Sequence, residues 1–224
     1  MQKYFTIYTS AELLCFITAL VCLLKAKEVH WRLLIPLMLV VTLVEFASVP
    51  IKVLYKANPI PKNSSAWMYN ILLFMQIGVF STVFYRLIGS YLGGKFMVVT
   101  GLIILLVLYT FELFTNDAGI FNYNAATYTT MSVVLVIYSL YYYYVLLKRE
   151  EYAELTYLPE FWWVTGTLFF FFGTTAVNLF YSYLLTSYPG NKLYLVYISD
   201  VLIVILYGCW SYAFICKRWI TSNK

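Results

Sequence analysis

The segment GTLFFFFGTTAVN (166–178) sets four consecutive phenylalanines among two glycines, three threonines and an asparagine. On the 3.6-residue period of an α-helix, Thr167, Thr174 and Asn178 fall on one stripe, with Gly166 and Gly173 beside it. Small residues on such a stripe let membrane helices approach closely, and Asn178 needs a polar partner in the interior. The segment therefore predicts a membrane-spanning helix that packs within a bundle, with its phenylalanines facing lipid or other helices.

Composition extends this interpretation to the whole chain of 224 residues. It is 62% hydrophobic and 11% charged, with a mean hydropathy of +0.78, far above that of soluble domains. Because a membrane span takes about 20 apolar residues in helical form, we predict an all-α polytopic membrane protein. The loops are too short for a soluble domain, so residues 1–224 form a single seven-helix domain. The predicted spans are 7–24, 33–55, 67–86, 96–114, 127–147, 161–184 and 193–215.

The distribution of positive charge predicts the orientation. Cytoplasmic loops of membrane proteins retain Lys and Arg. With the N-terminus outside, ten of the 15 Lys and Arg residues fall on the cytoplasmic side. The five on the outer side are Lys3, Lys52, Lys56, Lys62 and Lys192. This asymmetry favours an outer N-terminus and a cytoplasmic C-terminus, although three of the outer lysines cluster near the second loop.

A weak internal repeat relates the two halves of the chain. The segment LLKAKEVHWRLLIPLMLVVTLVEF (23–46) aligns without gaps on LLKREEYAELTYLPEFWWVTGTLF (146–169), pairing Pro36 with Pro159 and Phe46 with Phe169. The pattern indicates a 3+1+3 parallel duplication, an arrangement known from transporters. Its units would be about 4–90 and 127–216, with 96–114 as the linker helix. Chance similarity in so apolar a sequence is the alternative.

Three families can be compared with these residues. PQ-loop and sugar transporters share the 3+1+3 layout, but the chain contains no Pro-Gln dipeptide. Microbial rhodopsins need a lysine within the last helix for retinal, and LYLVYISDVLIVILYGCWSYAFI (193–215) has none. The segments YTSAELLCFITAL, WMYNILLFMQ and PEFWWVTGTLFFFFG resemble a group of uncharacterised bacterial seven-helix inner-membrane proteins. That resemblance implies the topology and a bacterial inner-membrane location, and no activity.

Polar residues within the spans are the candidate site. A carboxylate at bilayer depth costs on the order of 3 kcal/mol, so such groups face a watery or mutually satisfied interior. Most polar residues map to the outer half or the middle of their spans, whereas the inner halves are almost purely apolar. We expect an outward-facing pocket for a small ligand. The predicted ligand-binding residues are Glu12, Glu45, Asn70, Gln76, Thr174, Asn178 and Asp200.

The second span carries the strongest site signal. Pro50 cannot donate the helical hydrogen bond that would reach the carbonyl of Phe46, so a hinge is predicted next to Glu45. Lys52 lies two helical turns beyond Glu45, and it either neutralises Glu45 or extends to the outer interface. The alternative to a ligand or proton site is a protonated Glu45 that bonds a neighbouring helix through Asn70 or Gln76.

The sequence shows few of the residue patterns that catalysis, metal binding or cofactor binding require. The one histidine, His30, lies in an inner loop, and no His, Cys or carboxylate spacing resembles a metal site. We expect no enzymatic activity, no cofactor and no bound nucleic acid. The net charge of +5 fits the bias toward inner positive charge together with contact with anionic membrane lipids.

Three functions remain after these exclusions. The first is a receptor-like module that binds a small ligand in the outer pocket and relays occupancy to a cytoplasmic or membrane protein partner. The second is a small-solute or proton-coupled transporter, which the duplication and the predicted hinge favour. The apolar inner half favours the receptor, because a transport path needs polar groups on both sides. The third is an accessory subunit of a membrane complex that docks through aromatic faces such as the tyrosine run 141–144.

Overall fold

A computed structural model describes residues 6–57, 60, 64–91, 93–148, 155–187 and 192–222, without the side chains of 178–187, 192–196 and 220–222. All regular structure in these ranges is helical, with seven long α-helices, one short α-helix and two 3-10 turns. The elements are α1 (Ile7–Leu23), α2 (Val29–Arg32), α3 (Leu34–Ala57), α4 (Ala66–Ile88), α5 (Gly94–Thr115), η2 (Gly119–Phe121), α6 (Ala125–Leu147), η3 (Leu155–Tyr157), α7 (Pro159–Ser187) and α8 (Lys192–Ser222).

Long apolar helices make the chain a membrane protein with transmembrane helices. Among the described residues, five helical segments are long and apolar enough to cross a membrane: Val29–Ala57, Ala66–Ile88, Gly94–Thr115, Ala125–Leu147 and Tyr197–Trp219. The first of these joins α2 and α3. Helix α1 is apolar but has only 17 residues. Helix α7 continues beyond the last of its described side chains, Val177.

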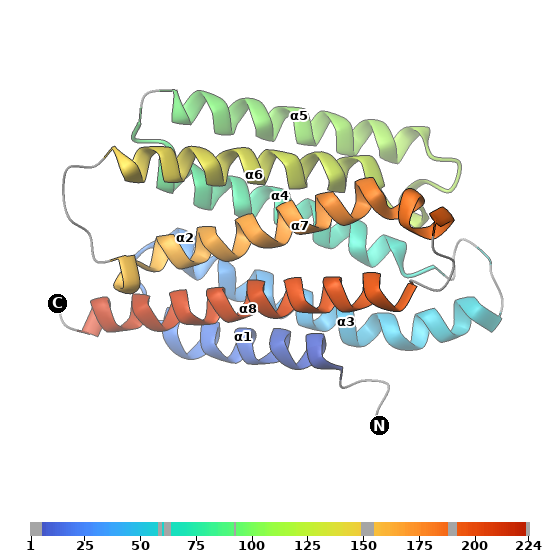
Figure 1. The fold of residues 1–224 in the computed structure, drawn as a ribbon, viewed down its shortest axis with the longest axis horizontal. Coiled ribbons are helices and arrows are strands. Elements are labelled where there is room, and N and C mark those ends of the chain that lie inside the picture. Colours follow the sequence, from blue (N-terminus) through green and yellow to red (C-terminus); the bar gives the residue numbers. More distant parts are fainter. Residues whose placement is uncertain are drawn as a thin grey trace.

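Helices that follow one another along the chain lie next to one another in the bundle (Figure 1). Helix α1 packs against α3 and α8, α7 lies between α6 and α8, and α4 contacts both α3 and α6. Helix α5 lies at the edge of the bundle, where it packs on α4 and α6. Helix α1 begins at one end of the bundle, here called the N-terminal end, and α8 ends at the opposite C-terminal end.

Helices α7 and α8 approach closely along the glycine stripe predicted from 166–178. A Cβ atom on Gly166 would lie 2.8 Å from Cys209 Cβ, and one on Gly173 would lie 2.6 Å from Leu202 Cδ2. At Gly166 the obstacle is a Cβ atom with the backbone oxygen of Leu206 at 3.1 Å behind it, so this position has no room for a side chain, whereas at Gly173 it is the movable end of Leu202. Phe171 is buried, whereas Phe169 and Phe172 are exposed on the outside of the bundle. The prediction that the glycines allow close helix approach is confirmed.

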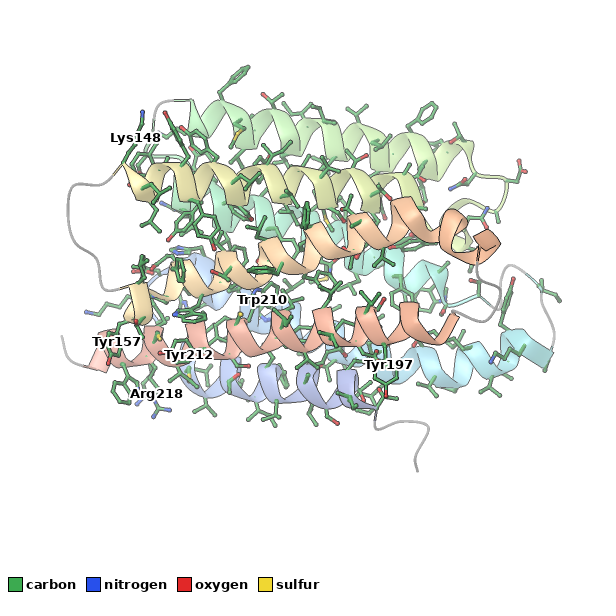
Figure 2. All side chains as sticks on the ribbon, viewed as in Figure 1. Lys148, Tyr157, Tyr197, Trp210, Tyr212 and Arg218 are labelled. Atoms are coloured by element: carbon green, nitrogen blue, oxygen red, sulfur yellow. The ribbon has the colours of Figure 1, made fainter. Side chains whose placement is uncertain are left out.

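Aromatic rings fill the middle of the bundle, where Figure 2 shows Trp210. Trp163 of α7 stacks on Trp210 of α8, and Phe80 of α4 contacts both indole rings and Phe171. Phe84 packs between Trp163 and Tyr138 of α6. These contacts join four helices in one layer, which separates the polar groups near the N-terminal end from those near the C-terminal end.

Candidate functional site

A buried carboxyl group on α1 is the centre of the candidate site. Glu12 is only 5% exposed, and its Oε1 accepts a hydrogen bond of 3.4 Å from the hydroxyl of Tyr207 on α8. Its Oε2 is buried and has no hydrogen-bond partner among the described residues. A buried polar atom without a partner costs about 1–3 kcal/mol, more when it is charged. Glu12 therefore has an unused acceptor that a proton or a cation would satisfy.

A second carboxyl group, on α3, belongs to a short chain of hydrogen bonds. The Tyr69 hydroxyl of α4 donates to Glu45 Oε1 at 3.0 Å and lies 3.2 Å from Ser48 Oγ. Lys52 Nζ donates to that same hydroxyl at 2.9 Å and lies 5.3 Å from the centre of the Tyr69 ring. Lys52 thus connects to Glu45 through the Tyr69 hydroxyl.

Glu12 and Glu45 lie near enough to interact electrostatically, and Lys52 also acts on Glu12. The Tyr207 hydroxyl interacts electrostatically with both carboxyl groups. Two neighbouring carboxylates in a region of low dielectric repel each other, and the repulsion is relieved by a proton or by bound positive charge. The four helices α1, α3, α4 and α8 therefore place two of the predicted residues, Glu12 and Glu45, within electrostatic range of each other, and this pair is called the acidic site below.

A small cavity adjoins this acidic site through Tyr207. Its volume is ≈ 90 Å³, well below the roughly 300 Å³ at which pockets for drug-sized ligands begin. At about 30 Å³ per water molecule, it holds about three waters or a ligand of a few heavy atoms. Trp210 and Phe80 of the aromatic layer form one wall. The lining residues are Leu37, Val41, Gln76, Phe80, Tyr128, Phe170, Phe171, Leu206, Tyr207 and Trp210.

Two predicted residues belong to this cavity and two others lie farther along their helices. Gln76 of α4 lines it directly, and Thr174 of α7 interacts with the hydroxyl of Tyr128, which also lines it. Asp200 is half-buried on α8, seven residues before Tyr207 and so on the same helix face. Within the described part of the chain, no hydrogen bond or ion pair joins Asp200 to Glu12 or Glu45. The side chain of Asn178 lies outside the described residues.

Asn70 makes its side-chain hydrogen bonds to the segment between α5 and α6 rather than in the acidic site. It is fully buried, and its Nδ2 donates to the carbonyls of Ile120 and Asn122 while its Oδ1 accepts from the backbone N–H of Asn124. These bonds attach α4 to the connection between α5 and α6. The α4 residue that bonds Glu45 is Tyr69, not Asn70 or Gln76, so that alternative named the right helix and the wrong side chain.

Helix α3 passes through Pro50 without ending. It is continuous from Leu34 to Ala57, and Pro50 itself is exposed. Two residues before Pro50, the Ser48 hydroxyl donates to the backbone carbonyl of Glu45 at 3.0 Å, whereas Tyr69 bonds the carboxyl group of Glu45. The predicted hinge at Pro50 therefore lies one turn from the acidic site.

An ion cluster at the C-terminal end was missed by sequence reasoning. Lys217 of α8 is only 8% exposed, and its Nζ lies 2.6 Å from Glu28 Oε2 and 3.9 Å from Glu160 Oε1. It also lies over the ring of Trp31, 5.4 Å from the centroid. The inner part of the bundle was expected to be almost purely apolar. The reason for the difference is that α7 and α8 extend past the predicted spans and carry Glu160 and Lys217 into the helix packing.

The comparisons with known proteins add no further constraint on the site. No family model, no curated protein and no solved structure matches this chain. Among the described residues, no three His, Cys, Asp or Glu side chains are grouped as metal ligands would be.

Proposed function

We propose that this chain is a receptor-like seven-helix membrane protein that binds a small cationic ligand between Glu12 and Glu45. The observation that carries the proposal is the buried Oε2 atom of Glu12, which has no hydrogen-bond partner among the described residues and whose carboxyl group lies within electrostatic range of Glu45. Intramembrane carboxyl groups are costly and usually serve ions, protons or ligands. The adjoining ≈ 90 Å³ cavity limits the ligand to a few heavy atoms.

The chemistry around Lys52 supports an ammonium group as the recognised part of the ligand. The chain's own ammonium donates to the hydroxyl of Tyr69, 5.3 Å from the centre of that ring, and this hydroxyl in turn bonds Glu45. An aromatic face together with a carboxylate is the usual recognition chemistry for ammonium ions. A small amine would place its charge between the two glutamates in the same way.

The proposal includes seven spans, an outer N-terminus and a cytoplasmic C-terminus in a bacterial inner membrane. The excess of Lys and Arg on the cytoplasmic side supports this orientation. The opposite placement of the start of α1 and the end of α8 fits an odd number of crossings. The edge position of α5 supports a linker role for 96–114 between duplicated units at about 4–90 and 127–216.

Helix α8 provides a route for signalling. Near its middle, Tyr207 bonds Glu12, and ten residues later Lys217 holds Glu28 and Glu160 at the C-terminal end. A ligand that prefers one position of Tyr207 shifts the population of bundle arrangements by its difference in affinity. The change would reach a cytoplasmic or membrane protein partner without enzymatic chemistry or a cofactor.

The transporter remains the second candidate because of the same ion cluster. Polar groups lie at both ends of the bundle, with the aromatic layer between them, as in a closed transport path. A receptor predicts ligand binding without flux, whereas a transporter predicts sustained flux that depends on the acidic site.

One experiment tests the proposal and separates the two candidates. A panel of small amines, with neutral compounds of equal size, is added to purified protein, and thermal unfolding is followed. An amine at 100 times its Kd should stabilise the wild type by about 2.7 kcal/mol, and Glu12→Gln or Glu45→Gln should abolish the shift. Thr82→Ala, which changes a hydroxyl bonded only within α4, should leave it intact.

The same variants are then placed in liposomes with the stabilising amine. No saturable uptake is expected. Uptake that Glu45→Gln abolishes would replace the receptor by the transporter, and equal stabilisation by amines and neutral compounds would refute the cation site. Pro50→Ala should change the basal response of the receptor without removing amine binding, because it alters the helix beside Glu45.

A further inference from the structure

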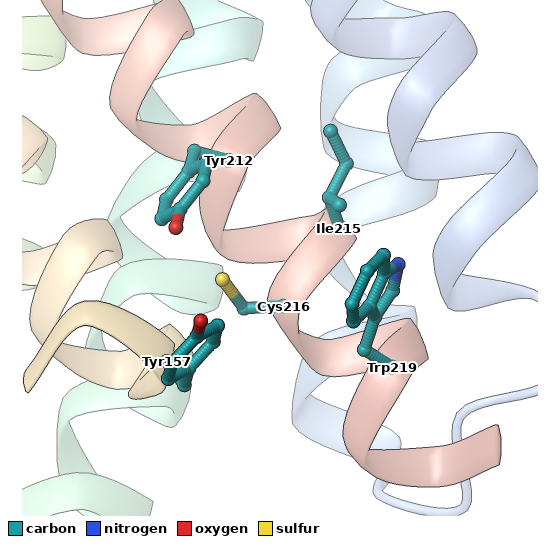
Figure 3. A pocket seen from close by; sticks show the side chains of 5 residues that line it. All are labelled: Tyr157, Tyr212, Ile215, Cys216 and Trp219. Atoms are coloured by element: carbon teal, nitrogen blue, oxygen red, sulfur yellow. The ribbon is translucent and has the colours of Figure 1, made fainter. Parts of the chain in front are cut away.

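A second pocket lies on the surface of α8 at the C-terminal end of the bundle. Its volume is ≈ 150 Å³, and its walls are Tyr157 of η3 and Tyr212, Ile215, Cys216 and Trp219 of α8 (Figure 3). The four α8 residues follow the i, i+3, i+4, i+7 spacing of one helix face. This pocket is separate from the acidic site, and none of its residues takes part in the proposed ligand binding.

The pocket has one polar side and one apolar side. Figure 3 shows the hydroxyl groups of Tyr157 and Tyr212 pointing toward the Cys216 thiol between them. Ile215 and Trp219 form the other side and are 39% and 65% exposed. An apolar cavity of about 150 Å³ holds a benzene-sized group, which is comparable to a short length of acyl chain. The pocket therefore suits an amphipathic molecule with hydrogen-bond acceptors at one end.

The polar wall is held in place by neighbouring residues. The carbonyl of Thr156 in η3 accepts a hydrogen bond from Trp162 Nε1 at 3.0 Å and lies 3.9 Å from Cys216 Sγ. The ring of Trp162 packs edge-on against Tyr212, with centroids 4.9 Å apart. These contacts fix η3 against α8, so the pocket is formed before any molecule enters it.

The position of the pocket identifies its surroundings as membrane lipid. The candidate membrane span of α8 ends at Trp219, and exposed Trp and Tyr side chains are typical of the headgroup region. Arg218 does not line the pocket, but it precedes Trp219 in α8 and lies at the same end of the bundle as Tyr157 and Tyr212 (Figure 2). It is exposed, and no carboxylate of the described residues lies within 4.0 Å of its guanidinium group. A guanidinium group binds phosphate through paired hydrogen bonds.

We propose that this pocket binds one anionic phospholipid. The phosphate lies against Arg218, the ester oxygens accept hydrogen bonds from Tyr157 and Tyr212, and the start of one acyl chain covers Ile215 and Trp219. The negative charge of the headgroup complements Arg218, which selects an anionic over a zwitterionic lipid.

Native mass spectrometry of the full chain tests this site with added phosphatidylglycerol or phosphatidylcholine. Wild-type protein should retain one phosphatidylglycerol more tightly than phosphatidylcholine, and Arg218→Gln should weaken it about tenfold. Lys148→Gln is the matched control, because Lys148 lies at the same end of the bundle over Tyr144 and away from the pocket (Figure 2). That variant should change retention less than about twofold.

Phosphatidylglycerol with a brominated acyl chain supplies a second readout. It should quench a fraction of the tryptophan fluorescence that Trp219→Phe removes, since the bromine atoms lie near that ring. Equal retention of both lipids, or equal effects of Arg218→Gln and Lys148→Gln, would overturn the site. So would a dimer that Trp219→Ala dissociates, because a second copy would then cover the pocket.

Discussion

Trp163 and Trp210 stack with their ring centroids 5.6 Å apart and their planes inclined by 15°. The two indole N–H groups are not equivalent. Trp210 Nε1 donates to the carbonyl of Trp163 and to Thr167 Oγ1, both at 3.2 Å, whereas Trp163 Nε1 is buried without a partner among the described residues. One ring of the stack therefore contributes packing alone, and the other contributes packing and hydrogen bonds.

This difference predicts unequal effects of the same substitution. Trp210→Phe should lower the free energy of unfolding by about 0.5–1.5 kcal/mol more than Trp163→Phe, because it removes hydrogen bonds to the Trp163 carbonyl and to Thr167 Oγ1, which remain bonded to each other. Thermal or denaturant unfolding of the purified variants measures the difference. Equal losses of stability would show that the hydrogen bonds of Trp210 contribute nothing.

Gly166 and Gly78 form a matched pair for testing helix approach. A Cβ atom on Gly166 meets Cys209, but one on Gly78 meets nothing within 4 Å. Gly78→Ala should stabilise α4 by up to about 1 kcal/mol through helix propensity. Gly166→Ala should instead destabilise the protein by about 1–3 kcal/mol through overpacking. If both variants gained stability, α7 and α8 would be farther apart than the structure places them.

Asn70→Ala should destabilise the protein without impairing amine binding. It removes the hydrogen bonds that hold the connection between α5 and α6, at a cost of about 1–3 kcal/mol for each buried group left unpaired. The unfolding midpoint and the amine-induced shift are measured on the same preparation. If Asn70→Ala kept the wild-type unfolding midpoint but lost the amine-induced shift, Asn70 would be a ligand-binding residue after all.

Lys217 and Glu28 should be energetically coupled. Their 2.6 Å contact buries the lysine, so Lys217→Met or Glu28→Gln alone leaves one charge poorly compensated. The double variant should lose less stability than the sum of the single losses, by about 0.5–3 kcal/mol. Additive losses would show that the contact between Lys217 and Glu28 contributes no net stability.

The length of the apolar stretches was sufficient to predict the long helices, since a helix that crosses a membrane needs about 20 predominantly apolar residues. The glycines of 166–178 also predicted a close helix contact correctly, which is the approach of α7 to α8. Within a membrane span, a residue without a side chain serves mainly to let another helix come close. Helix ends were predicted less well. The extra turns of α7 and α8 carry polar residues that hydropathy assigns to loops, although they pack inside the bundle.

The candidate site was only partly predictable. Glu12 and Glu45 stand out because carboxyl groups are rare in spans. Their partners Tyr69 and Tyr207 do not, since the chain has 23 tyrosines and Glu12 lies 195 positions from Tyr207. Asn70 and Gln76 look equivalent in sequence, yet only one faces the cavity. Which polar group meets which depends on helix rotation, and apolar patterning does not determine rotation to that accuracy.

The shortness of α1 has a consequence for the surrounding bilayer. Its 17 residues extend about 26 Å, less than the roughly 30 Å hydrocarbon layer that α3, α4 and α5, with 22 to 24 residues each, can cross. Such hydrophobic mismatch is relieved by local thinning or by polar groups drawn inward. Glu12 lies on α1, the shortest of the seven long helices described, so its distance from water depends on membrane thickness. A thicker bilayer would make entry of a charged ligand slower, and lipid composition would then tune the site from outside the protein.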